Sequence, residues 1–117
     1  MKDLFKEILT TDEVEGVMLF SFDGKLIFKE VLSPVPEGFA KGDWWRLIIE
    51  SMEDVSEADI VFEKCQIYMR KTDVGFLIVL MGIFAPLAMV RLNCDILTPS
   101  LKKASSSRLG GLFKKRP

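Results

Sequence analysis

The chain has 117 residues, of which 49% are hydrophobic and 28% charged, with a formal net charge of −1. This length and composition predict a single globular domain and argue against a disordered chain. Histidine is absent, which excludes imidazole bases and ligands, and the two cysteines are too few for a four-thiolate metal site.

Charge is distributed unevenly along the chain. Residues 98–117 contain six basic residues and no acidic one. Residues 1–97 therefore keep ten basic and 17 acidic residues, a net charge of −7. An acidic body is unlike a nucleic-acid-binding protein, so we expect no nucleic-acid partner. The basic tail is either a solvated segment or a contact for an acidic partner such as anionic lipid.

The first third of the chain predicts one helix and a hairpin. Residues 3–11 place four apolar side chains on one helical stripe. Two strands follow at residues 14–22 and 25–32. The dipeptide Asp23-Gly24 between them favours a type I′ turn, with positive φ at both positions. Residues 33–42 contain Pro34 and Pro36 and are expected to form a loop.

A second helix is expected from Trp44 to about Val55. Its apolar residues span an arc of about 200°, whereas a helix resting on one sheet needs a stripe of about 100°. Trp44 and Leu47 lie at the outer edge of this arc. Either the loop at residues 34–39 covers them or a protein interface does, and we favour the interface.

Three strands are expected next, at residues 58–63, 66–71 and 75–81, followed by a helix from about Ala85. Residues 74–90 carry no charge and approach the length of a membrane span. Glycines and Pro86 interrupt this run, which favours a buried central strand followed by a helix that begins near the proline. Val90, Cys94 and Leu97 lie at helical spacing, and Leu101 extends the stripe if the helix continues through Pro99.

The resulting order is αββαβββα, an α+β sandwich. We expect a domain at residues 1–104 and a flexible basic tail at residues 105–117. The N-terminal segment lacks the apolar core of a secretory leader, so we expect a cytoplasmic protein with reduced thiols.

The sequence offers no sign of catalysis. It contains no phosphate-binding loop, dinucleotide fingerprint or CxxC pair. Cys94 lies on the apolar helix stripe, and Cys65, in a predicted turn, has only Lys64 as a cationic neighbour. We therefore expect no enzyme, cofactor or metal.

Two stretches resemble the Roadblock dynein-light-chain family over about residues 3–104. Residues 14–19 (VEGVML), followed by Phe22-Asp23-Gly24, are similar to the first hairpin of that family. Residues 76–81 (FLIVLM) and 85–92 (APLAMVRL) are similar to its last strand and helix. The long loop at residues 33–42 and the Trp44-Trp45 pair depart from the pattern.

The resemblance implies a profilin-like or longin-like fold, with a five-stranded antiparallel sheet in order 2-1-5-4-3 and helices on both faces. It also implies pairing of two chains through the third strand and second helix. Members are non-catalytic regulators or scaffolds of small Ras-like GTPases, or cargo adaptors of dynein. In prokaryotes the paired second helices often form the face on which the GTPase docks.

These considerations lead to two predicted sets of interface residues. The dimer interface is expected at Trp44, Leu47, Ile48, Ser51, Val55, Asp59 and Val61. A partner is expected to dock at Arg46, Glu50 and Glu53. A heteromeric partner stays open. Two alternatives are a small-molecule sensor with a pocket lined by Trp45 and Met52, and a membrane-associated adaptor that uses residues 74–90 or 109–116.

Overall fold

The computed structural model describes residues 2–32, 42–52 and 54–107. A short 3-10 helix (Lys2–Phe5) leads into α1 (Lys6–Leu9), and the strands β1 (Val14–Phe20) and β2 (Leu26–Val31) follow. Helix α2 (Gly42–Ser51) precedes β3 (Glu57–Val61), β4 (Gln66–Lys71) and β5 (Phe76–Met81), and α3 (Leu87–Ser107) is the last element. The predicted αββαβββα order is confirmed.

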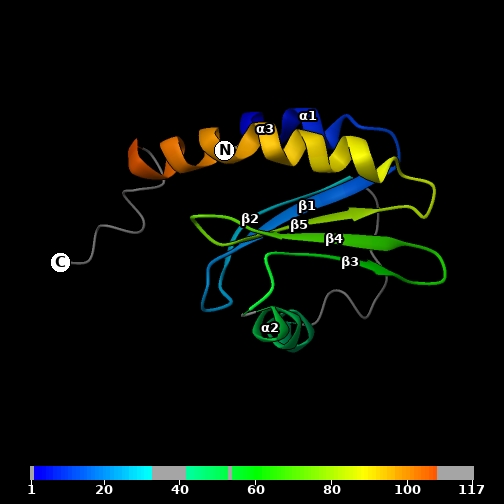
Figure 1. Cartoon of the computed structure of the whole chain (residues 1–117), viewed down its shortest axis with the longest axis horizontal. Helices are drawn as coiled ribbons and strands as arrows, with labels where there is room; N and C mark the ends of the chain where they lie inside the picture. Colours follow the sequence, from blue (N-terminus) through cyan, green and yellow to red (C-terminus); the bar gives the residue numbers. More distant parts are fainter. Residues whose placement is uncertain (1, 33–41, 53, 108–117) are drawn as a thin grey trace.

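All five strands form one antiparallel sheet in the order β2-β1-β5-β4-β3. Helices α1 and α3 cover one face of this sheet, and α2 covers the other (Figure 1). The predicted fold class and strand order are therefore both correct.

Strand β5 lies at the centre of the sheet and contributes to a core on each face. Leu77, Val79 and Met81 pack under α1 and α3, whereas Ile78 and Leu80 pack with α2. All six residues of β5 are buried, as expected for a strand covered on both faces. The uncharged run at residues 74–90 is thus a central strand followed by the start of a helix. In the part of the chain that the structure describes, no helix has both the length and the hydrophobicity needed to cross a membrane.

The hairpin between β1 and β2 differs from the predicted type I′ turn. Among the described residues, Gly24 has a φ of +90° but Asp23 does not have a positive φ. The Ser21 N–H donates to the Lys25 carbonyl (2.8 Å), and the Gly24 N–H donates to the Ser21 carbonyl (3.0 Å). The loop therefore contains three residues, 22–24, and ends in a left-handed glycine.

Both later helices differ from their predicted limits. Helix α2 ends at Ser51, four residues before the predicted end, and the Met52 N–H donates to the Ile49 carbonyl (3.0 Å) in a tighter turn. Helix α3 continues through Pro99 to Ser107, and Leu101 is fully buried. Residues 105–107 are thus helical, although they were expected in the tail. The division into a domain and a tail stays a prediction, and residues 108–117 lie outside the described part.

Candidate partner interface

Helix α2 presents one side to the sheet and another to solvent. Trp45, Ile49 and Met52 are buried against the sheet, each no more than 4% exposed. Ile48 is half-buried at the edge of the same cluster, and Leu47 is 61% exposed. The wide apolar arc thus leaves a large apolar side chain in solvent. The side chain of Trp44, the loop at residues 33–41 and Glu53 lie outside the described part.

Strand β3 is an edge of the sheet, because it pairs with β4 alone. The Phe62 N–H donates to the Cys65 carbonyl (2.7 Å), and the Lys71 N–H donates to the Ser56 carbonyl (2.9 Å). Even-numbered residues therefore direct their backbone groups toward β4. Since the direction alternates along an antiparallel strand, the N–H and C=O groups of Glu57, Asp59 and Val61 point to the open edge.

The side chains of β3 alternate between the two faces of the sheet. Ala58, Ile60 and Phe62 pack into the core beneath α2. The side chains of Asp59 and Val61 point to the α3 face, and Val61 is 65% exposed. Of the residues predicted at the dimer interface, those on β3 therefore lie on the opposite face from those on α2. Ile60 and Phe62, which lie on the same face as α2 and are indicated by the apolar alternation in residues 58–62, are not in the predicted set.

Ser51 and Val55 complete the described part of the predicted interface. Ser51 is exposed, and its hydroxyl donates to the Leu47 carbonyl (2.9 Å). Val55 is 38% exposed and lies beyond the end of α2. The assignment of these residues to a dimer interface stays a prediction.

Two of the three residues predicted to dock a partner border a cavity, and the third, Glu53, lies outside the described residues. Arg46 and Glu50 are exposed on α2 and border a cavity of about 590 Å³ at the β1–β2 turn. The other lining residues come from that turn, α2, β4 and β5: Phe22, Asp23, Gly24, Ile49, Lys71 and Phe76. Trp45 and Met52, expected to line a ligand pocket, are core residues and do not border it.

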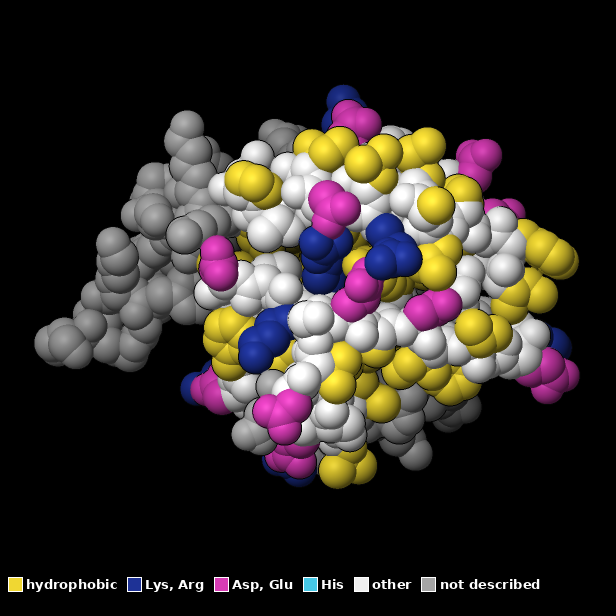
Figure 2. Space-filling model, viewed as in Figure 1, with side chains coloured by type: hydrophobic (Ala, Val, Ile, Leu, Met, Phe, Trp, Pro, Cys, Tyr) yellow, Lys and Arg dark blue, Asp and Glu magenta, His cyan; other side chains and the backbone are white. Residues whose placement is uncertain are grey.

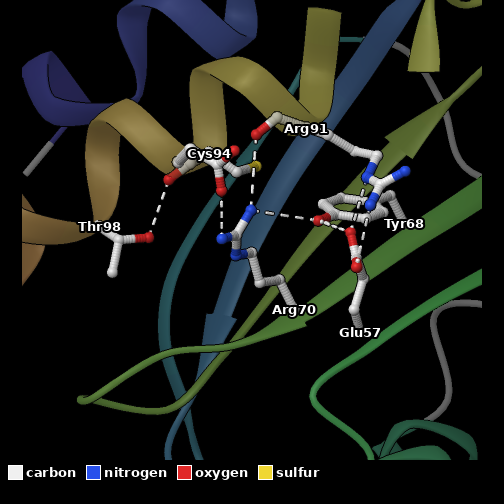
Figure 3. Close-up of polar contacts among 7 residues, drawn as sticks. Glu57, Tyr68, Arg70, Arg91, Cys94 and Thr98 are labelled. Carbon is white, nitrogen blue, oxygen red and sulfur yellow. Dashed lines mark hydrogen bonds and ion pairs between the residues drawn. The ribbon is translucent and has the colours of Figure 1, made fainter. Parts of the chain in front are cut away.

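A polar network that the sequence analysis missed joins α3 to the edge of the sheet (Figure 3). One oxygen of the Glu57 carboxylate accepts from the Tyr68 hydroxyl (2.5 Å) and the Arg91 Nε (2.8 Å), and the other accepts from Arg91 Nη2 (3.2 Å). Arg70 on β4 forms an ion pair with Asp95 on α3. The two ion pairs attach the edge strand β3 and its neighbour β4 to α3.

The network shifts the pKa values of Glu57 and Tyr68. The hydrogen bond from Tyr68, together with the nearby Arg91 guanidinium, lowers the pKa of Glu57 below its ordinary value of 4.5. Burial and the hydrogen bond to Glu57 raise the pKa of the Tyr68 hydroxyl. Glu57 is therefore charged and Tyr68 neutral at physiological pH.

Neither cysteine has the environment of a nucleophile. Burial raises the pKa of Cys94 to about 12, and burial also raises the pKa of Cys65. Both are free thiols. Within residues 2–32, 42–52 and 54–107, no three His, Cys, Asp or Glu side chains gather in a way that could hold a metal ion.

No protein-family model matches the sequence, and no curated protein matches it significantly. Solved structures do match the fold. A structure described as MglB with a tetrameric arrangement superimposes with a TM-score of 0.73 at 15% identity, covering 90% of this chain and 87% of that chain. A Roadblock/LC7 domain from Streptomyces avermitilis gives 0.69 at 16% identity, covering 92% and 95%. MglB from Myxococcus xanthus gives 0.68 at 17% identity, covering 90% of each chain. This chain therefore has the fold of the Roadblock/LC7 domain and of MglB.

Proposed function

We propose that this protein is a non-catalytic, cytoplasmic homodimer that regulates or scaffolds a small Ras-like GTPase. The likeness of its fold to MglB and to a Roadblock/LC7 domain supports this proposal. Two neighbouring features carry the dimer. Strand β3 is an open edge of the sheet, and helix α2 beside it exposes Leu47 to solvent. Self-association also fits the tetrameric arrangement described for one MglB structure.

One two-fold axis beside β3 satisfies both features. Antiparallel pairing of β3 with its copy would bond the outward N–H and C=O groups of Glu57, Asp59 and Val61. The same operation would bring the two α2 helices together on one face of a ten-stranded sheet. Leu47 and Ile48, with Trp44, would then be covered, and a tryptophan in such a patch commonly contributes about 2 kcal/mol or more of binding free energy.

Proline substitution on β3 tests this arrangement directly. Val61→Pro removes an N–H that points to the open edge, so it should convert a dimer into a folded monomer in sedimentation equilibrium at micromolar concentration. Ile60→Pro is the matched control, because its N–H points toward β4 and its loss should unfold the chain. Trp44→Glu should also give a monomer. A wild-type protein that stays monomeric at every accessible concentration would contradict the proposal.

Docking of the GTPase is tested separately. Purified Ras-like GTPases loaded with GDP or a GTP analogue should be retained by the immobilised wild-type protein. Arg46→Glu and Glu50→Lys, on the exposed side of α2, should weaken retention, and Glu53→Lys tests the third predicted residue. Lys29→Glu, exposed on β2 at the other edge of the sheet, is the control and should have no effect.

The cavity of about 590 Å³ beside α2 supports a second candidate, a small-molecule sensor. Arg46 and Lys71 supply positive charge at this cavity, and Asp23 and Glu50 supply negative charge. A metabolite that raises the melting temperature of the wild type but not of Phe22→Ala would favour this function over the GTPase regulator.

A further inference from the structure

The outer face of helix α3 carries an apolar stripe that no described part of the chain covers. Met89, Leu92 and Ile96 lie at the helical spacing of three and four residues, and they are 49%, 50% and 64% exposed. The stripe from Met89 to Ile96 is about 10 Å long at 1.5 Å per residue. Figure 2 shows apolar side chains along the top of the molecule, where α3 lies in Figure 1.

The side of α3 that faces the sheet is filled by other residues. Val90, Cys94, Leu97 and Leu101 form the buried row. Met89, Leu92 and Ile96 are therefore not needed to pack α3 on the sheet. A helix that only packs on its own sheet would carry polar side chains at these outer positions.

The charged residues of α3 near the stripe are already paired. Arg91 binds Glu57, and Asp95 binds Arg70, both on the flank of α3 that faces the edge of the sheet. The outer face between Ala88 and Ser100 consists of uncharged residues: Ala88, Met89, Leu92, Ile96, Pro99 and Ser100. On the opposite flank, Asn93 donates to Thr11 and to the Glu7 carbonyl, and this α1 side carries the exposed acids Glu7 and Asp12.

Positive charge follows the stripe along the chain. Lys102 and Lys103 lie in the last turns of α3, and the sequence beyond it contains Arg108, Lys114, Lys115 and Arg116 with no acid. An apolar stripe that is followed in the sequence by six basic residues within positions 98–117 is the pattern of a segment that binds anionic membrane surfaces. A second copy of this face offers no acidic residue after Asp95 to match that charge.

From these observations we propose that the outer face of α3 docks on an anionic lipid surface, and that the basic residues that follow this face in the sequence supply the matching charge. Leu92 and Ile96 enter the boundary between headgroups and acyl chains, and the cations are attracted to acidic headgroups. Three apolar side chains are few, so one copy binds weakly and reversibly. The proposal is independent of the proposed GTPase and of the α2 interface.

Flotation of the full-length protein with lipid vesicles tests the proposal. The wild type should float with phosphatidylcholine vesicles that contain about one-third phosphatidylglycerol, and not with pure phosphatidylcholine. High salt should release it, because exposed charges separated by a Debye length are screened. Leu92→Glu combined with Ile96→Glu should weaken binding at least about tenfold.

The matched control is Leu26→Glu on β2. Leu26 is also 50% exposed, but it lies on an edge strand far from α3 in the sheet order. This variant should bind anionic vesicles as the wild type does. Replacement of Lys114, Lys115 and Arg116 by Gln provides a second test that leaves the described fold untouched, and it should weaken binding without changing the melting temperature.

Three results would overturn the proposal. The first is failure of the wild type to float with anionic vesicles, or equal flotation with neutral ones. The second is unchanged vesicle binding in both the stripe and the charge variants. The third is a stripe variant that lowers the sedimenting mass but leaves vesicle binding unchanged, which would identify the stripe as an interface between copies of this chain.

Discussion

At the scale of single residues, Gly75 is the most constrained position in the turn between β4 and β5. Its φ is +152°, and a Cβ atom built there would lie 2.0 Å from the Phe20 carbonyl oxygen. The turn is closed by Thr72, whose N–H and hydroxyl both donate to the Gly75 carbonyl at 2.8 Å. The backbone of β1 and this turn together leave no room for a side chain.

Gly75→Ala should therefore lower the free energy of unfolding by at least about 2 kcal/mol, because it combines backbone strain with a clash against fixed backbone. Gly24→Ala is the control. Gly24 also has a positive φ, but the atom nearest to its built Cβ is the side-chain Cγ of Arg46 at 3.8 Å. Its loss should be about 1 kcal/mol. Equal losses in urea denaturation would show that the contact with Phe20 is unimportant.

Glu57 gives the protein an acid-sensitive contact. Its pKa is lowered by the Tyr68 hydroxyl and by Arg91, so the folded state favours the carboxylate. The stability that follows is present above the ordinary pKa of 4.5 and is lost as the pH falls through the lower pKa of the folded state. Glu57→Gln should be less stable than the wild type at neutral pH, and the difference in melting temperature should shrink below about pH 4.5.

Thermal unfolding by circular dichroism between neutral pH and pH 3, roughly the range in which carboxylates titrate, measures this difference. The exposed Glu63→Gln is the control and should follow the wild type throughout. A stability difference between the wild type and Glu57→Gln that does not change with pH would show that the hydrogen bond stabilises the fold and the carboxylate charge does not. None of these contacts could be predicted from the sequence, because Glu57 and Arg91 are 34 residues apart and neither has a local signal.

At the scale of elements, hydrophobic patterning predicts what is buried more reliably than where an element ends. The six apolar residues of β5 predict a central strand, and the structure confirms it. The predicted type I′ turn between β1 and β2 is wrong because Ser21, which precedes the Asp23-Gly24 dipeptide, takes part in the loop. The Ser21 hydroxyl donates to the Asp23 carboxylate and accepts from the Lys25 N–H (3.0 Å), which stabilises the three-residue loop.

Helix α2 was predicted too long for a similar reason. Apolar spacing continues to Val55, but the last helical residue is Ser51, whose hydroxyl bonds to the helix backbone. For α3 the sequence leaves open whether the helix continues through Pro99, because a proline inside a helix normally ends it. Here α3 continues, and its next turn places Leu101 fully in the core.

Leu101→Ala tests whether the part of α3 after Pro99 belongs to the folding unit. The substitution should lower the free energy of unfolding by about 2–5 kcal/mol, the usual range for a buried leucine. Ile96→Ala, at a position that is 64% exposed, should change it by less than about 0.5 kcal/mol. A negligible loss at Leu101 in urea denaturation would mean that the helix frays after the proline.

At the scale of the whole molecule, the strand order followed from the resemblance and not from composition or periodicity. Strand order depends on pairings between distant segments, whereas periodicity reports only local exposure. The same limit applies to Asp59 and Val61, the two β3 residues predicted at the dimer interface. Both have open backbone groups at the edge, but their side chains lie across the sheet from α2. The register of β3 against β4 is needed to show which β3 side chains lie on the same face of the sheet as α2.

Because the sheet separates α2 from α3, the molecule has two distinct faces. If two copies join through their β3 strands, both α2 helices lie on one face of the dimer, and both apolar stripes of α3 lie on the other. Such a pair is bivalent toward a surface, since one stripe already engaged raises the effective concentration of the second. By linkage, a surface that engages both stripes must strengthen the pairing by the same factor. Dimerisation and surface attachment would then depend on each other although they share no residue, and the side that carries α2 would face away from the surface.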